Sequence, residues 1–229
     1  MRDFLTTFRE LGVVAETAEA LERLGITTPF PVQQMALPIA LTGGDVLAQA
    51  KTGTGKTLAF GIPLLQRITA SAKASASADR PQALVVVPTR ELCVQVTTDL
   101  DHAGWLRSVR TLAVYGGRAF APQVAALRHG LDVVVGTPGR LLDLVRRGHL
   151  DLSQVRVLVL DEADQMLDQG FLPDVEKIIA ATPASRQTML FSATMPNPVV
   201  ELGRRYMSRP TQIRATDPAD TGATVAAVE

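Results

Sequence analysis

Cysteine is almost absent from this sequence, and net charge is absent altogether. Cys93 is the one cysteine among 229 residues, which excludes a disulfide within the chain and favours a reducing compartment. The 23 lysines and arginines are balanced by 23 aspartates and glutamates, so no overall field attracts a polyanion. Any contact with nucleic acid must therefore be local.

Long hydrophobic runs are lacking as well. Charged residues separate the apolar ones near the N-terminus, and no uninterrupted apolar run approaches the roughly 18 residues that a membrane span requires. The sequence therefore predicts a soluble, cytoplasmic protein with no membrane partner.

Short runs rich in Val, Leu and Ile recur between segments of helical character. Such nearly continuous apolar runs are typical of parallel strands that helices cover on both faces. Together with a hydrophobic fraction of 46%, they predict one large α/β domain around a mostly parallel central sheet. The predicted strands are Asp45–Ala50, Ala83–Val87, Arg110–Tyr115, Asp132–Gly136, Val155–Leu160, Thr188–Phe191 and Thr211–Arg214.

Two segments lack the bulky residues that a core needs. The stretch between Ile68 and Gln82 is rich in Ser and Ala, which predicts an exposed crossover loop of little fixed structure. The tail from Ala215 to Glu229 has a similar composition and is interpreted as a linker, so the domain is expected to cover residues 1–214.

The segment AKTGTGKT, residues 50–57, follows the first predicted strand. It matches the phosphate-binding loop pattern except for Ala50, which stands at the first glycine position. Gly53 and Gly55 allow the backbone amides around Thr52 and Thr54 to face phosphate oxygens. Lys56 supplies charge to the phosphates, and Thr57 offers a hydroxyl to Mg²⁺. The alternative is an ordinary glycine turn between a strand and a helix.

A second cluster of polar residues follows the strand that ends at Leu160. Asp161 is suited to coordinate Mg²⁺, and Glu162 to orient or deprotonate an attacking water. Taken alone, the tetrapeptide DEAD at 161–164 would more often be a solvated helix start, because acids favour the first turn. The phosphate-binding loop makes a catalytic interpretation preferable.

Three further segments follow predicted strands. Pro88, Thr89 and Arg90 begin PTREL, and Thr137, Pro138, Gly139 and Arg140 form TPGR. Both resemble helix starts whose outward-facing amides suit a phosphate, and Gly116 and Gly117 allow close backbone approach beside Arg118. Each segment alone is an ordinary helix start or turn.

These motifs, with Ser192-Ala-Thr194 and with GITTPFPVQ at 25–33, occur in the order found in the DEAD-box RNA helicases. The chain resembles the first RecA-like domain of that family over about Phe8 to Arg214. The resemblance implies ATP and Mg²⁺ as ligands and RNA as a partner. It also implies that Thr89 and Thr137 belong to a surface that contacts RNA backbone, which would give little sequence discrimination.

The resemblance assigns the adenine site to residues 8–33. Gln33 corresponds to the glutamine that contacts the adenine edge, because its amide can both accept and donate a hydrogen bond. Phe8 corresponds to an upstream aromatic that packs on or near the base, although a lone Phe is more often a core residue. Ile26 stands where many members have an aromatic, and Thr28 belongs to the same segment.

Asp164, Ser192 and Thr194 are expected to form hydrogen bonds that couple the γ-phosphate to RNA, although an isolated Ser-Thr turn is common. The three histidines, His102, His129 and His149, show no metal-ligand spacing and receive no function.

The family's second RecA-like domain has no counterpart in these residues, and it would supply an arginine finger and half of the RNA surface. We therefore expect an RNA helicase half that binds nucleotide and hydrolyses it slowly. Two alternatives stay open at this stage, namely an ATPase that acts on DNA and a non-catalytic RNA-binding module.

Overall fold

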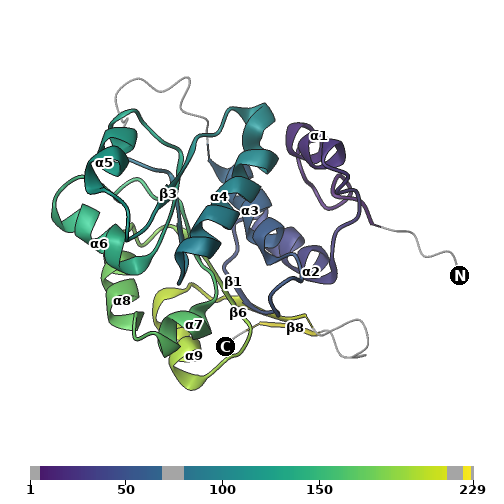
Figure 1. Ribbon diagram of the computed structural model, residues 1–229. Coiled ribbons are helices and arrows are strands. Elements are labelled where there is room, and N and C mark those ends of the chain that lie inside the picture. The colour runs from purple at the N-terminus through teal and green to yellow at the C-terminus, as the bar shows by residue number, and fades with distance from the viewer. Residues whose placement is uncertain (1–5, 69–79, 216–223, 228–229) are drawn as a thin grey trace, which may run out of the picture.

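The computed structural model describes residues 6–68, 80–215 and 224–227. In that part of the chain, eight strands form one sheet in the order β3-β4-β2-β5-β6-β1-β7-β8 (Figure 1). The strands are β1 Val46–Gln49, β2 Ala83–Val86, β3 Thr111–Val114, β4 Val133–Gly136, β5 Val157–Leu160, β6 Gln187–Ser192, β7 Thr211–Arg214 and β8 Thr224–Ala227.

Helices connect the strands and cover the sheet. They are α1 Ala15–Arg23, α2 Pro31–Ala40, α3 Lys56–Arg67, α4 Arg90–Gly104, α5 Phe120–Arg128, α6 Pro138–Arg146, α7 Ala163–Asp168, α8 Leu172–Ala180 and α9 Asn197–Tyr206, with a short 3-10 helix over Trp105–Arg107. Among the described residues, none of these helices is both long and apolar enough to cross a bilayer.

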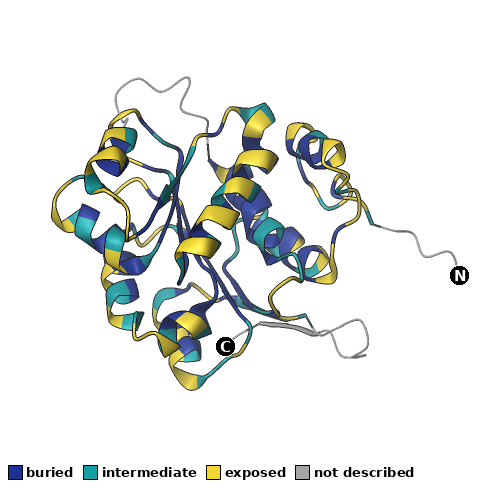
Figure 2. Cartoon of the chain, in the orientation of Figure 1, coloured by how far each residue is buried: buried dark blue, intermediate teal, exposed yellow. Residues whose placement is uncertain are grey.

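The strands are buried on both faces, which explains their continuous apolar runs. Along β5, Val157 and Val159 pack into the cluster that contains α2, α3 and α4. Leu158 and Leu160 pack into the opposite cluster, which is formed with α6 to α9. Figure 2 shows the strands as a buried central layer between the two helical layers. Because successive side chains of a strand point to opposite faces of the sheet, one strand contributes residues to both hydrophobic clusters.

The predicted parallel arrangement is confirmed for β1 to β7, since every recorded pairing among these strands is parallel. β8 is antiparallel to β7, with Arg214 opposite Thr224. Thr224–Ala227, which lies within the segment interpreted as a linker, therefore forms a strand of this sheet. A strand at an open sheet edge is held by backbone hydrogen bonds, which need no bulky side chains.

The predicted crossover segment joins α3 to β2, and its residues 69–79 lie outside the described residues. The same is true of residues 216–223 and 228–229 in the predicted linker.

Sheet order divides the sequence motifs into two groups. β5, β6 and β1 are neighbours, so the DEAD segment, the end of β6 at Ser192 and the phosphate-binding loop lie at the ends of adjacent strands. β3, β4 and β2 are neighbours on the other half, and they lead into Gly116, Thr137 and Pro88. Because parallel strands end at one edge, both groups lie along the carboxyl edge of the sheet.

Candidate nucleotide site and nucleic-acid interface

The phosphate-binding loop leaves β1 and turns sharply into α3. Gly53 and Gly55 have positive φ values of 83° and 85°, as the predicted curl requires. A Cβ at Gly55 would lie 2.5 Å from Nε2 of Gln33 and 2.7 Å from Cδ2 of Phe30. This glycine is therefore needed both for its backbone conformation and for the close approach of α2.

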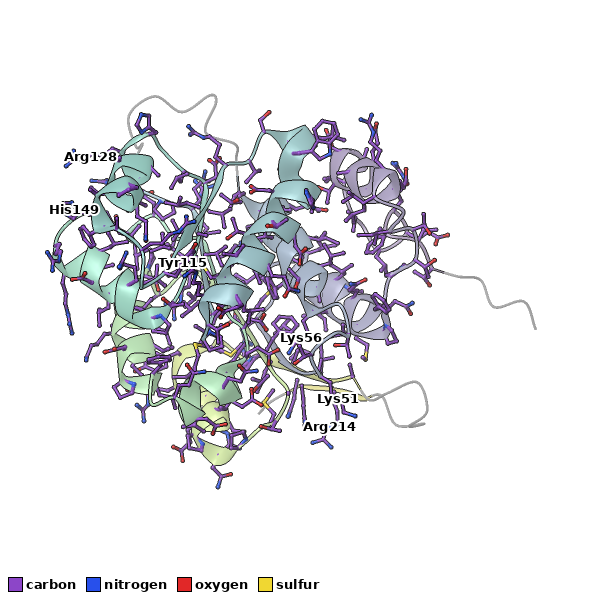
Figure 3. The ribbon with its side chains drawn as sticks, viewed as in Figure 1. Lys51, Lys56, Tyr115, Arg128, His149 and Arg214 are labelled. Carbon is purple, nitrogen blue, oxygen red and sulfur yellow. The ribbon has the colours of Figure 1, made fainter. Side chains whose placement is uncertain are left out.

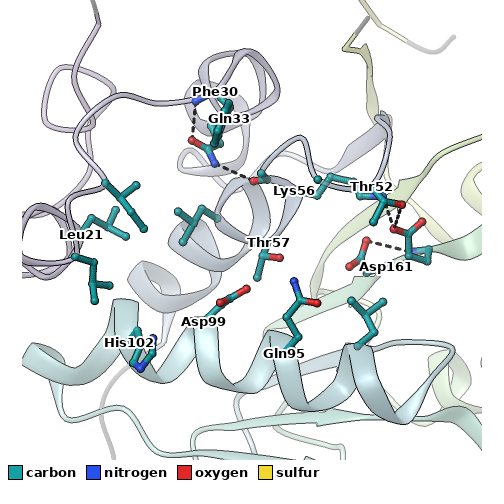
Figure 4. A pocket seen from close by; sticks show the side chains of 17 residues that line it. Leu21, Phe30, Gln33, Thr52, Lys56, Thr57, Gln95, Asp99, His102 and Asp161 are labelled. Atoms are coloured by element: carbon teal, nitrogen blue, oxygen red, sulfur yellow. Dashed lines mark hydrogen bonds and ion pairs between the residues drawn. The ribbon is translucent and has the colours of Figure 1, made fainter. Parts of the chain in front are cut away.

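Lys56 forms a buried ion pair with Glu162. Lys56 Nζ lies 2.7 Å from Glu162 Oε1, and the two side chains are 5% and 3% exposed. The hydroxyl of Thr52 donates to the same carboxylate oxygen at 3.1 Å. Glu162 Oε2 is buried and has no hydrogen-bond partner in the described structure. The loop and the DEAD segment thus meet directly, in the pocket shown in Figure 4.

Asp161 is buried beside this pair. Its Oδ1 accepts a hydrogen bond from the backbone N–H of Glu162 at 3.0 Å, and Glu162 has a φ of 52°, which is uncommon for a residue with a side chain. Burial raises the pKa of Asp161 to about 7, while Lys56 opposes the rise and Glu162 adds to it. Close carboxylates of this kind are characteristic of functional sites.

Gln33 connects the second helix to the phosphate-binding loop. Its Oε1 accepts from the backbone N–H of Phe30 at 2.9 Å, and its Nε2 donates to the carbonyl of Gly55 at 2.9 Å. The residue is 1% exposed. A glutamine amide has a second lone pair on the oxygen and a second N–H, so both groups retain capacity for a ligand edge.

A cavity of about 350 Å³ unites these residues. Sequence-predicted residues that line it are Ile26, Gln33, Thr52, Gly53, Gly55, Lys56, Thr57, Asp161 and Glu162. Three predicted residues do not line it. Phe8 is 3% exposed and packs in the core, Thr28 is exposed, and the Thr54 hydroxyl donates to the carbonyl of Lys51. For Phe8 the structure supports the alternative of a core residue.

Other lining residues were not predicted. They are Leu21 from α1, Leu24 directly after α1, Phe30, and Leu92, Gln95, Asp99 and His102 from α4. The α4 residues at 92, 95, 99 and 102 recur at intervals of three and four, which is one face of a helix. From this spacing the sequence predicts that the four residues share one face of a helix. It does not predict that this face borders the cavity and is not covered by α3.

The two residues predicted to bind metal offer oxygen atoms, which are the ligands that Mg²⁺ prefers. Thr57 and Asp161 both line the cavity and offer a hydroxyl and a carboxylate. Mg²⁺ commonly uses one or two protein oxygens and takes its other ligands from phosphate and water. In the part of the chain that the structure describes, no group of three or more His, Cys, Asp or Glu could hold a metal on its own.

Asp164 joins the DEAD segment to the loop after β6. Its backbone N–H donates to Ser192 Oγ at 3.0 Å. Its Oδ2 accepts from the backbone N–H of Thr194 at 2.9 Å and from the Thr194 hydroxyl at 2.8 Å. The hydrogen bonds expected among these three residues are therefore present.

The second group of motifs forms an exposed surface on the other half of the sheet edge. Thr89 caps α4, with its hydroxyl accepting from the N–H of Leu92 at 3.2 Å. Thr137 begins α6 without a side-chain cap. The exposed or half-exposed predicted residues are Thr89, Arg90, Gly116, Gly117, Arg118, Thr137, Gly139 and Arg140.

Pro88 and Pro138 are buried, unlike the other predicted residues of this surface, and their contact with RNA stays a prediction. Each precedes or occupies the first turn of a helix, where a fixed φ suits the backbone. Cys93 on α4 is fully buried, and burial raises the pKa of its thiol to about 12, in agreement with a small core residue.

The sheet order, the phosphate-binding loop and the paired carboxylates together define a nucleotide-binding α/β domain of the P-loop class. A family model described as DEAD/DEAH box helicase matches residues 30–202. The chain belongs to this family.

Individual relatives agree with the family match. The chain is 47% identical over 210 residues to the DEAD-box ATP-dependent RNA helicase CshA of Geobacillus kaustophilus, covering 92% of this chain and 44% of that protein. It is 50% identical over 215 residues to the ATP-dependent RNA helicase DeaD of Escherichia coli, covering 93% and 33%. The chain thus spans less than half the length of these curated relatives.

A solved structure shows the same fold. A DEAD box protein from the hyperthermophile Methanococcus jannaschii superimposes with a TM-score of 0.86 and 37% identity, over 93% of this chain and 57% of that one. The predicted RecA-like α/β architecture is confirmed.

Proposed function

We propose that this chain is the ATP-binding half of an RNA-dependent ATPase that unwinds short duplexes or remodels RNA–protein complexes. The observation that carries the proposal is the contact between Lys56 and Glu162 inside a cavity that Gln33 also lines. This arrangement supports a site in which a lysine for phosphate, a carboxylate pair and an amide suited to a base edge surround one ligand-sized space. The names of the relatives, which are ATP-dependent RNA helicases, support the same function.

Each residue has a role that follows from its position. The Lys56 ammonium exchanges Glu162 for the β- and γ-phosphates of ATP, and the amides of the loop around Gly53 hold phosphate oxygens. Thr57 and Asp161 hold Mg²⁺, which supplies positive charge to the phosphates. Glu162, released from Lys56, orients or deprotonates the attacking water. Gln33 uses its remaining donor and acceptor on adenine.

RNA binds along the exposed residues after β2, β3 and β4. Arg90, Arg118 and Arg140 present guanidinium groups, and the glycines at 116 and 117 present bare backbone. Contacts of this type go to phosphate and sugar, so we propose binding without strong base preference. Contacts to 2′-hydroxyls would favour RNA over DNA. The proposed substrates, ATP and RNA, favour a cytoplasmic location.

Full activity requires a second RecA-like domain, in our proposal, on the opposite side of the nucleotide. The described cavity has Lys56, Asp161 and Glu162 on one wall, and phosphoryl transfer needs positive charge from the other wall as well. The greater length of the relatives supports this arrangement. We therefore expect residues 1–229 to bind nucleotide, to hydrolyse it slowly and to leave RNA duplexes intact.

Calorimetric titration of the 229-residue chain with ADP, ATP, GDP and GTP tests the nucleotide site. The proposal expects adenine nucleotides to bind in the presence of Mg²⁺ and guanine nucleotides to bind more weakly. The ATPase rate of the chain joined to a second RecA-like domain should rise with single-stranded RNA and less with DNA of the same sequence. Equal stimulation by DNA would favour the DNA-directed alternative, and absence of nucleotide binding would favour the non-catalytic one.

A further inference from the structure

The charge of the chain is unevenly distributed, although its sum is zero. Between Trp105 and Leu150 the acidic residues are Asp132 and Asp143, and Asp132 is fully buried. The arginines of the same segment are Arg107, Arg110, Arg118, Arg128, Arg140, Arg146 and Arg147. The region of β3, α5, β4 and α6 therefore carries a local excess of positive charge, which is what a nearly neutral protein needs to hold a polyanion.

Part of this charge is arranged as a row on two aromatic rings. The guanidinium carbons of Arg90 and Arg118 lie 5.1 and 5.5 Å from the centre of the Tyr115 ring. Arg140 donates from Nη2 to the carbonyl of Arg118 at 3.1 Å. The row thus passes from the start of α4, through the loop after β3, to the start of α6.

Beyond Arg140 the row continues on a second ring, Phe120. The guanidinium carbons of Arg140 and Arg147 lie 5.5 and 5.0 Å from its centre. The ring of His149 packs against it edge-to-face, with centroids 5.6 Å apart. Figure 3 shows Tyr115 and His149 on the side of the molecule where α5 and α6 lie. Arg147 and His149 belong to none of the motifs to which RNA binding was assigned above.

Stacking on an aromatic face leaves the edge of a guanidinium free to donate hydrogen bonds. It holds the group in place and lowers the entropy lost when a phosphate binds. Arg147 also pairs with Asp143 one turn earlier in α6, at 2.7 Å between Nε and Oδ1. Both side chains are well exposed, at 61% and 40%, and an exposed pair of this type contributes little energy, so it does not bar a phosphate.

We propose that Arg147 and His149, supported by Phe120, extend the RNA-binding surface by holding backbone phosphates of the nucleotides that flank the segment bound by the motifs. This inference rests on the proposed function, because it concerns the same RNA strand. Its support is the unbroken series of ring and hydrogen-bond contacts from Arg90 to His149 and the local excess of arginine. A surface of this length should bind long RNA more tightly than short RNA, because only a long strand can reach both the motifs and Arg147.

Fluorescence anisotropy with labelled single-stranded RNA tests the extension. Oligonucleotides of about 6 and about 15 nucleotides would be titrated with the 229-residue chain at several salt concentrations in the presence of ATP and Mg²⁺. Arg147→Gln should weaken binding of the longer RNA by about 3- to 10-fold and lower its salt slope by about 0.7, the value for one lost phosphate contact. Binding of the shorter RNA should not change, and Arg147→Lys should restore most of the loss.

Arg205→Gln is the matched control. Arg205 also lies over an aromatic ring, Tyr206 at 5.9 Å, and pairs with a carboxylate, Glu176 at 2.7 Å, but it belongs to α9. This variant should bind both RNAs as the unchanged chain does. If Arg147→Gln matches Arg205→Gln, or weakens both RNAs equally, the extension is wrong while the proposed function stands. If the unchanged chain binds neither RNA, even when it is joined to a second RecA-like domain, the proposed function and the extension both fail.

Discussion

Lys56 and Glu162 hold each other at 2.7 Å in a site where neither side chain is more than 5% exposed. In the proposed function, a nucleotide phosphate replaces this carboxylate as the partner of Lys56. We predict that Lys56→Ala weakens ATP binding by more than 10-fold, because the phosphates lose their charged partner and Glu162 is left buried without compensation. Isothermal titration of Lys56→Ala and of the unchanged chain with ATP in the presence of Mg²⁺ measures the change in affinity.

Glu162→Gln should behave differently. It removes the group that competes with phosphate for Lys56, so ATP affinity should be retained or increased. Hydrolysis should fall by at least about 100-fold in a protein that includes the second domain, because the group proposed to activate water is lost. An equal loss of ATP affinity in both variants would contradict the assignment of Glu162 to hydrolysis.

Gln33 gives a prediction about base selectivity. Its contacts with Phe30 and Gly55 place the amide at the loop, so Gln33→Ala should reduce affinity for ADP several-fold while GDP affinity changes less. Gln34→Ala is a suitable control, since Gln34 is exposed and its amide donates to the carbonyl of Pro29 outside the cavity. Competition binding with both nucleotides measures the ratio. A preference for adenine that survives in Gln33→Ala would refute this role.

Thr194 gives a prediction about coupling. Thr194→Val removes the hydroxyl that donates to Asp164 at 2.8 Å but leaves the backbone contact at 2.9 Å. RNA stimulation of ATPase activity in the two-domain protein should fall, with little change in the separate affinities for ATP and RNA. Thr194→Ser retains the hydroxyl and should remain close to the unchanged protein. The idea fails if Thr194→Val loses ATP or RNA affinity to the same degree as stimulation.

The sequence predicted where the loop and the carboxylates lie, because backbone geometry and motif coincide at those positions. The strand before Asp161 and the glycines at 53 and 55 define where the loop and the carboxylates must lie, since parallel strands end at one edge. Phe8 and Thr28 could not be placed in this way. Both come from the segment before the sheet, whose packing depends on contacts far along the chain.

Other features depend on tertiary neighbours that no local pattern encodes. His102 reaches the cavity because α4 packs beside α3, and isolated histidines give no signal of that. The row from Arg90 to His149 requires β3, β2 and β4 to be adjacent, and the sheet order was not predicted. β8 is similar, because Thr224–Ala227 forms a strand by pairing with the edge of β7, and the sequence does not show that this edge is free.

Asp161 and Asp164 should affect stability in opposite directions as pH changes. Burial raises the pKa of Asp161 from an ordinary 3.8 to about 7. Burial also acts to raise the pKa of Asp164, but hydrogen bonds from Thr194, Ser192 and Gln165 lower it overall. Replacement of each residue by asparagine removes a titrating carboxyl. The change in stability with pH then shows whether that carboxyl stabilises or destabilises the folded chain.

Between about pH 4 and pH 7, Asp161 stays protonated in the folded chain but is ionised in the unfolded chain. This carboxyl therefore makes folding less favourable as pH rises through that range. Asp161→Asn should therefore be more stable than the unchanged chain at pH 8, by more than about 1 kcal/mol, with the difference shrinking toward pH 4. Asp164→Asn should be less stable at pH 8, and its difference should shrink as pH falls below the ordinary pKa of aspartate. Urea denaturation of the three proteins from about pH 2 to about pH 8, without nucleotide or metal, measures both trends, because the Asp164 difference changes only below the ordinary pKa of aspartate. A stability gain for Asp161→Asn that is constant with pH would show that packing, and not the buried charge, causes it.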